Sequence, residues 1–223
     1  MTQAPSDLLE DPVSFQAHDL VWLKAGALDR QREWACALPD WALSELERDT
    51  PLIVRRALAT PGVIPVGIRG HRRSQRQATY LPITEVGRRV NPLLLRVCSA
   101  RADRAFLPAL KAWEQLKSRA SIVAYPCGPT GSCAYELATQ CDWVTEGSDL
   151  DLVVSIDAPI SRRQANDLLS AFYSDACRTD VQVMTPRGGM ALVEWAGGSE
   201  RVLLKTIHGP VLTDSPWDIE EQP

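Results

Sequence analysis

The stretch Gly147-Ser148-Asp149-Leu150-Asp151-Leu152-Val153-Val154 decides the expected fold and site of this chain. Its aliphatic and β-branched residues predict a strand, on which successive side chains point to opposite faces. Asp149 and Asp151 therefore share one face, and the leucines between and after them enter a core on the other. Two neighbouring carboxylates repel each other unless a cation compensates their charge. Because Mg²⁺ binds one or two carboxylates together with substrate phosphates, the stretch indicates phosphoryl or nucleotidyl transfer.

The composition of the 223-residue chain is that of a globular protein, with a formal net charge of −4 from 24 basic and 28 acidic side chains. This balance argues against a nucleic-acid partner. No apolar run approaches the ~20 residues of a membrane span. The N-terminus also lacks the basic-then-apolar layout of a signal peptide. We therefore expect a cytoplasmic protein without a membrane partner. The six cysteines and three histidines have no zinc-ligand spacing.

Two regions differ in their element pattern. Residues 1–90 predict a smaller α/β N-terminal domain whose first dozen residues are disordered. It contains a short apolar run at 19–23, strand-like runs at 52–54 and 63–68, and a helix starting at Asp40. Residues 91–223 predict helices around 107–116, from Ser132 and after a Ser161 cap, with strands at 149–156, 180–184, 191–195 and 202–206. This order indicates a mixed sheet with helices, so the expected fold class is α+β.

Three short pieces form the candidate site. Gly131-Ser132 opens a predicted helix, whose unpaired N-terminal N–H groups bind anions. Asp149-x-Asp151 begins a strand, and Asp180 begins the next strand after one helix, so that it could lie beside the first two. Three carboxylates can hold two Mg²⁺ ions, one activating the attacking oxygen and one binding the leaving pyrophosphate. Each piece alone also occurs as an ordinary turn, cap or surface strand, and only the combination indicates catalysis.

Basic side chains supply further candidates for phosphate binding. Arg69, Arg72 and Arg76 lie in a dense basic stretch directly after the predicted strand 63–68. Because arginine forms bidentate contacts with phosphate, these residues could bind a phosphorylated substrate or meet an acidic protein partner. A solvated loop is the alternative for this stretch. Lys205, inside the predicted strand 202–206, is another candidate for pyrophosphate, with a solvent-facing strand lysine as its alternative.

Gly131-Ser132, residues 148–152 and Asp180 together resemble the signature of the DNA polymerase β-like nucleotidyltransferase superfamily. A longer set of stretches resembles the phosphoribosyl-dephospho-CoA transferases of malonate decarboxylase, and comprises residues 18–23, 66–70, 74–76, 131–152 and 209–211. The resemblance implies that residues 91–223 are a nucleotidyltransferase domain. It also implies Mg²⁺ as the cofactor, triphosphoribosyl-dephospho-CoA as the donor and a serine of the malonate decarboxylase acyl carrier protein as the acceptor, with release of pyrophosphate.

The resemblance assigns roles to the site residues. Asp149 and Asp151 become metal ligands, and Asp180 becomes a third ligand or the base that receives the serine proton. Gly131, Ser132 and Ser148 become phosphate-binding residues. Two other functions stay open, namely a nucleotidyltransferase of the same fold with another protein or small-molecule acceptor, and a non-catalytic binding module. The intact acidic and glycine-serine pieces argue against the non-catalytic module.

Overall fold

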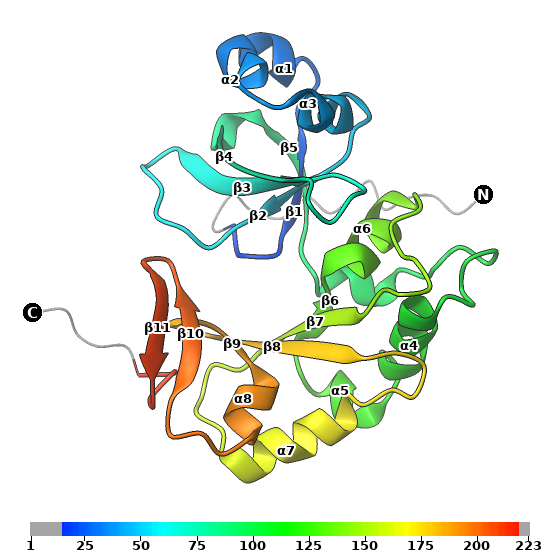
Figure 1. Cartoon of the computed structure of the whole chain (residues 1–223), viewed down its shortest axis with the longest axis vertical. Coiled ribbons are helices and arrows are strands. Elements are labelled where there is room, and N and C mark those ends of the chain that lie inside the picture. Colours follow the sequence, from blue (N-terminus) through cyan, green and yellow to red (C-terminus); the bar gives the residue numbers. More distant parts are fainter. Residues whose placement is uncertain (1–14, 219–223) are drawn as a thin grey trace, which may run out of the picture. The chain divides into compact units, whose positions relative to one another are not determined.

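The structure is a computed structural model that describes residues 15–218. The chain divides into two compact units, Met1–Asn91 and Pro92–Pro223, whose elements are labelled in Figure 1. The disorder expected for the first dozen residues concerns a segment outside the described residues. Within residues 15–218, no helix has both the length and the apolar character needed to cross a membrane.

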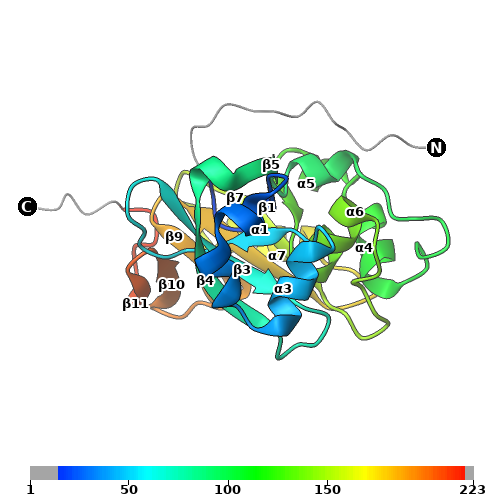
Figure 2. The same ribbon diagram turned by 90° about the horizontal axis from the view of Figure 1, so that it is seen from above.

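The first unit is an antiparallel sheet with helices on one face. Its strands follow the order β4-β3-β2-β1-β5, and α1 and α3 lie in front of β3 in the view from above (Figure 2). Leu46 of α3 shares a core with Val66 and Ile68 of β3, as the helical and strand periods of these segments predict. The elements are β1 (Leu20–Leu23), α1 (Ala27–Arg30), α2 (Arg32–Cys36), α3 (Asp40–Glu47), β2 (Leu52–Val54), β3 (Val63–Arg69), β4 (Arg76–Pro82), η1 (Ile83–Glu85) and β5 (Val86–Val90).

The second unit contains a mixed sheet in the order β11-β10-β9-β8-β7-β6. Strands β7 and β8 are parallel and flank one helix in the chain, whereas the other neighbours are antiparallel. The α+β class and the mixed sheet are therefore confirmed. The elements are η2 (Leu94–Val97), α4 (Pro108–Leu116), α5 (Ala120–Val123), β6 (Cys127–Pro129), α6 (Gly131–Thr139), β7 (Leu150–Ser155), α7 (Arg162–Ala171), β8 (Thr179–Thr185), β9 (Gly188–Ala191), α8 (Leu192–Ala196), β10 (Val202–Thr206) and β11 (Gly209–Thr213).

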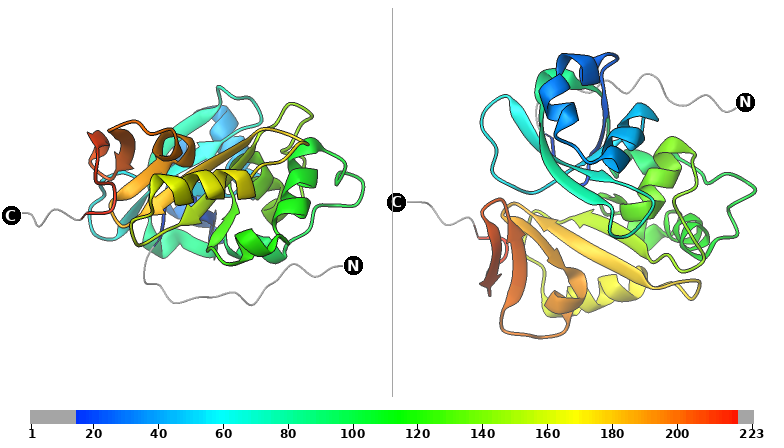
Figure 3. Two further views of the ribbon diagram at one scale, coloured as in Figure 1. Left: turned by 90° about the horizontal axis from the view of Figure 1, so that it is seen from below. Right: turned by 45° about the horizontal axis from the view of Figure 1, so that its top comes forward.

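The two faces of strands β7 and β8 have different character. Leu152, Val154 and Val183 are buried on one face. Helix α8 contacts β8, β9 and β10, and α7 packs against α8, so that α7 crosses in front of the strands when the molecule is seen from below (Figure 3, left). Because side chains alternate along a strand, Asp151 and Asp180 lie on the other face. Burial of the apolar face in the core thus fixes the strands that carry the acidic residues on their other face.

The predicted strand 191–195 is wrong, because β9 ends at Ala191 and the following five residues form α8. Two glycines let β9 start directly after the turn, since a Cβ at Gly188 would overlap the carbonyl oxygen of Lys205 on β10. The residues after β9 bury Leu192 and Trp195. This spacing of three is that of a helix face rather than of an alternating strand.

The helix α7 begins with the predicted Ser161 cap. The Gln164 amide N–H donates to Ser161 Oγ at 3.2 Å, and the Ser161 amide donates to Gln164 Oε1 at 2.8 Å. We expect Ser161→Ala to lower the free energy of unfolding by about 1 kcal/mol. Chemical denaturation measures this difference. Ser170→Ala, later in the same helix, is the matched control and should change stability by less than about 0.5 kcal/mol; an equal loss in both variants would contradict the assignment of the cap.

Candidate active site

The start of α6 lies against the carboxylate of Asp151. Gly131 has a φ of +58°, in the left-handed region that other residues avoid. A Cβ at this position would also overlap Oδ2 of Asp151. The N–H of Thr130 donates to the backbone oxygen of Asp151 at 2.8 Å, which ties this turn to β7. Glycine is therefore required for two separate reasons, and the anion-binding end of a helix shares one location with a carboxylate.

Two of the predicted acidic residues are neighbours across the parallel strands. Asp151 of β7 pairs in register with Asp180 of β8, so the two side chains share a face on strands about 4.8 Å apart. Asp149 immediately precedes β7 and is exposed, as is Asp180, whereas Asp151 is half-buried. Arg178 Nη2 lies 4.0 Å from Asp180 Oδ2 in an exposed pair. The structure thus brings Gly131, Asp151 and Asp180 together.

The two predicted serines have different surroundings. Ser132 is buried in the first turn of α6, directly after Gly131. Ser148 instead accepts a hydrogen bond from the Thr145 amide at 2.9 Å, and its hydroxyl lies 3.2 Å from Thr145 Oγ1. Ser148 therefore closes the turn that leads into Asp149, and its contact with a phosphate stays a prediction.

Lys205 lies on the same sheet face as the acidic residues but at a distance along it. Met184 pairs with Gly189, and Gly189 pairs with Lys205, which puts all three on the face of Asp180. Two strand spacings and four residues separate Lys205 from Asp180. At ordinary strand dimensions this separation is roughly 15 Å between the backbones. Lys205 is exposed and is not part of the group formed by Gly131, Asp151 and Asp180.

The predicted basic loop is the turn of a hairpin in the first unit. Arg69 ends β3 and Arg76 begins β4, and the two residues are directly opposite in the antiparallel register. Arg72 lies in the turn, where its backbone N–H donates to Gln75 Oε1 at 3.0 Å. Like charges directly opposite each other destabilise a sheet. The contact of Arg69, Arg72 and Arg76 with a phosphate stays a prediction.

A thiol also lies next to the start of α6. Cys133 is fully buried, and this burial, with a smaller contribution from the nearby Glu136 carboxylate, raises the pKa of the Cys133 thiol far above its ordinary range. A thiol that stays protonated is a poor nucleophile. Cys133 therefore supports packing of α6 rather than a covalent route through a thiolate.

The sequence reasoning missed a buried ion pair behind the site. Glu136 of α6 accepts hydrogen bonds from Arg104 Nε at 2.6 Å and from Arg104 Nη2 at 3.0 Å. The one available signal was a single acidic residue in the otherwise apolar run Ala134 to Leu137. Nothing in the sequence around Arg104 distinguishes it from the neighbouring arginines.

The residues present fit a magnesium ion that binds together with a polyphosphate. Within residues 15–218, no group of three His, Cys, Asp or Glu side chains is placed to hold a metal ion. Asp151 and Asp180 offer two carboxylates on one face, which is the number that Mg²⁺ takes from a protein when substrate phosphates complete its ligands. The start of α6 offers N–H groups to those phosphates, and Asp149 could supply another oxygen.

Comparison with known proteins covers both units. Residues 94–216 match the model of the phosphoribosyl-dephospho-CoA transferase MdcG C-terminal domain, and residues 16–92 match that of the MdcG N-terminal domain. A phosphoribosyl-dephospho-CoA transferase of Pseudomonas putida is 39% identical over 92% of this chain and 96% of its own length. One from Azotobacter vinelandii (strain DJ) is 39% identical, with 91% of this chain and 94% of that protein covered. The search of solved structures returned no significant match.

These matches confirm the family resemblance expected from the sequence. They extend through both units, and the named relatives are covered almost from end to end. The chain therefore belongs to the phosphoribosyl-dephospho-CoA transferase family and is a transferase enzyme.

Proposed function

We propose that this enzyme transfers the 2′-(5″-phosphoribosyl)-3′-dephospho-CoA group from 2′-(5″-triphosphoribosyl)-3′-dephospho-CoA to a serine of the malonate decarboxylase acyl carrier protein. The names of its relatives support the transferred group. The observation that carries the proposal is the seating of the α6 start at Gly131 against the Asp151 carboxylate. Such a site suits a polyphosphate bound with a cation. The proposal includes a nucleotidyltransferase fold for the second unit and a cytoplasmic location.

The proposed reaction is a displacement at phosphorus. The serine oxygen forms a bond to the α-phosphorus of the donor, and the bond from that phosphorus to the oxygen bridging to the β-phosphate breaks. The serine proton passes to a carboxylate, for which Asp180 is the candidate because it is exposed beside Asp151. Pyrophosphate leaves with the bonding electrons, and a phosphodiester joins the prosthetic group to the carrier.

Charge neutralisation and positioning provide the catalysis in this proposal. The N–H groups at Gly131 and Ser132 hold the polyphosphate. Asp149 and Asp151 would hold Mg²⁺, which when bound neutralises charge on the phosphates, and Asp180 is either a further ligand or the base. Ser148 is retained as a proposed contact of the donor phosphates, and Lys205 stays a candidate for a more distant phosphate group of the donor. Arg69, Arg72 and Arg76 of the first unit stay proposed phosphate-binding residues.

The direct test combines purified enzyme, apo carrier protein, donor and Mg²⁺. We expect the intact mass of the carrier to increase by the mass of the phosphoribosyl-dephospho-CoA group, with one pyrophosphate released for each modified carrier. A carrier with its acceptor serine changed to alanine is the control and should stay unmodified. Pyrophosphate release without a mass gain on the carrier would contradict the proposed acceptor.

Removal of divalent cations should abolish the transfer. Carboxylates beside a polyphosphate need a cation to offset their repulsion, and this effect is worth several kcal/mol, or about a thousandfold in rate. The measurement is the rate of carrier modification in excess EDTA, followed by the rate after MgCl₂ is added back. Circular dichroism spectra in both conditions control for unfolding. Undiminished turnover in EDTA would refute the proposed role of the metal.

A further inference from the structure

Glu136 is an acidic residue placed where acids are seldom found. It lies on α6, the helix that starts at Gly131, and only 2% of its surface is exposed. A buried charge is costly unless it is paired and hydrogen-bonded. The groups that pair with Glu136 offset this cost, and they are therefore held in place by the Glu136 carboxylate.

Both oxygens of the Glu136 carboxylate are fully engaged. Oε2 accepts the amides of Trp143 at 2.9 Å and Val144 at 2.7 Å. The two-pronged contact with Arg104 completes the set. Burial raises the pKa of Glu136, but the bonds from Arg104 and the two amides outweigh burial and lower this pKa overall. The carboxylate is thus charged at neutral pH and shared between a side chain and a stretch of backbone.

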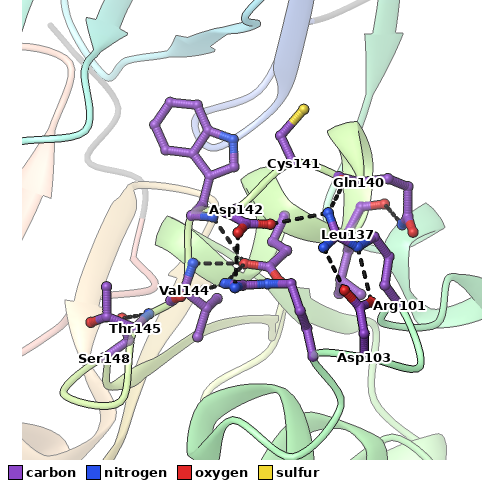
Figure 4. A network of polar contacts seen from close by, with 12 residues as sticks. Arg101, Asp103, Leu137, Gln140, Cys141, Asp142, Val144, Thr145 and Ser148 are labelled. Carbon is purple, nitrogen blue, oxygen red and sulfur yellow. Dashed lines mark hydrogen bonds and ion pairs between the residues drawn. The ribbon is translucent and has the colours of Figure 1, made fainter.

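Arg104 also binds residues 142–144 directly. Its Nη2 donates to the carbonyl oxygen of Val144 at 2.6 Å, and its Nη1 donates to the exposed Asp142 at 3.1 Å. Trp143 packs on Tyr135 of α6, with ring centroids 4.8 Å apart. These contacts hold residues 142–144 against α6 through two amides, one carbonyl and one ring. Asp142 and Val144 are labelled within the polar network of Figure 4.

Residues 142–144 lead directly into the acidic strand. After Val144, the turn closed by Thr145 and Ser148 is followed by Asp149 and then by β7 with Asp151. The other end of α6 meets the same strand where Gly131 faces Asp151. Helix α6 therefore contacts the residues before β7 through Glu136 and contacts β7 itself through Gly131.

We infer that Arg104 and Glu136 are positioning residues of the transferase site, which hold the start of α6 and the acidic pair Asp149 and Asp151 at one fixed separation. The inference rests on the proposed function for its substrate, a polyphosphate bound with Mg²⁺. An apolar pair could fill the same space without the cost of burying two charges. An apolar pair would leave the amides of Trp143 and Val144 without their acceptor, so the connection could shift relative to α6.

Glu136→Gln is the primary test of this inference. Glutamine keeps the shape but has one oxygen, so an NH₂ group must face either Arg104 or the two amides. We expect kcat for carrier modification to fall about 10–100-fold, as for other residues that orient ligands, with an unchanged KM for the carrier. The Mg²⁺ concentration for half-maximal rate should rise about tenfold. An unchanged kcat and Mg²⁺ requirement would overturn the inference.

Asp142→Asn is the matched control, because asparagine keeps a side-chain oxygen toward Arg104. The substitution removes only an exposed charge, which also pairs with Arg101, and leaves every contact of Glu136 in place. This variant should match the wild type in kcat and in its Mg²⁺ requirement, and losses as large as those of Glu136→Gln would contradict the assignment. Arg104→Lys keeps the charge but loses the fork and should behave like Glu136→Gln. If Glu136→Gln does not fold, Arg104→Lys carries the test, and full activity in Arg104→Lys overturns the inference.

Two readouts do not depend on turnover. Calorimetry with inorganic triphosphate and Mg²⁺ should give about tenfold weaker binding to Glu136→Gln than to the wild type. Hydrogen exchange should accelerate at the amides of Trp143 and Val144 and in the turn up to Asp149, with no change in Asp142→Asn. The proposed acceptor and the positioning role can fail separately. If the wild type binds Mg²⁺-triphosphate more tightly than Glu136→Gln does but leaves the carrier unmodified, the proposed acceptor is refuted and the positioning role is supported. Equal binding and exchange in all proteins would refute the positioning role.

Discussion

Asp151→Asn should reduce carrier modification about a thousandfold and leave the fold intact. The substitution preserves size and the backbone pairing of β7, but it removes the half-buried negative charge at the start of α6. Loss of a carboxylate that compensates a cation is worth several kcal/mol in a reaction governed by charge neutralisation. The measurement is kcat/KM for transfer, together with the thermal unfolding midpoint and the circular dichroism spectrum of the variant.

Asp157→Asn is the control for this prediction. Asp157 is exposed and lies two residues beyond the C-terminal end of β7, the strand that carries Asp151. Its substitution therefore removes an equal charge without changing the contact at the start of α6. It should retain the activity of the wild type. Wild-type activity in Asp151→Asn, or an equal loss in both variants, would exclude Asp151 as the central acidic residue.

Among the substitutions at the candidate site, Gly131→Ala should have the second largest effect, with transfer reduced about a hundredfold. The new methyl group would overlap Asp151 Oδ2, so either the carboxylate or the first turn of α6 must move. A displacement of about 1 Å at a reacting centre costs on the order of a hundredfold in rate. The left-handed backbone at this position adds about 1–3 kcal/mol of destabilisation, measurable by chemical denaturation.

Gly147→Ala is the matched control. Gly147 lies in the turn before β7, close in sequence to the acidic residues, but its backbone and its neighbours would tolerate a side chain. A Cβ at Gly147 meets nothing within 4 Å, and its φ lies outside the left-handed region. We expect a change in stability below about 0.5 kcal/mol and an unchanged rate. If Gly131→Ala were as active and as stable as Gly147→Ala, the close approach of α6 to Asp151 would be irrelevant to the reaction.

Local patterns predicted most of the elements because they encode secondary structure directly. The helical spacing of apolar residues predicted α4 and α7. The predicted Ser161 cap is present with both of its hydrogen bonds. The same reasoning failed for α8, because a run of five residues with four apolar side chains around Glu194 fits a short strand or a short helix equally well. Packing against the sheet and the early start of β9 at Gly188 decided between them.

For the candidate site, local patterns predicted some neighbours, and strand pairing decided the others. Alternation along β7 predicted that Asp149 and Asp151 share a face, and the order of elements suggested Asp180 as their neighbour. The register between β7 and β8 turns that suggestion into an in-register pair, Asp151 with Asp180. Lys205 was a further phosphate-binding candidate in the sequence, but two strand spacings separate it from Asp180 and three separate it from Asp151.

By itself, the sequence determined the acidic strand, the glycine-serine helix start and the family, because these depend on neighbouring residues and on recurring motifs. Only the tertiary structure decided that Gly131 meets the Asp151 carboxylate and that Arg104 and Glu136 clamp the connection into β7. Such contacts join residues far apart in the chain, and Arg104 and Glu136 are separated by 32 positions. Their distances depend on strand register and core packing, which no local preference of the chain encodes.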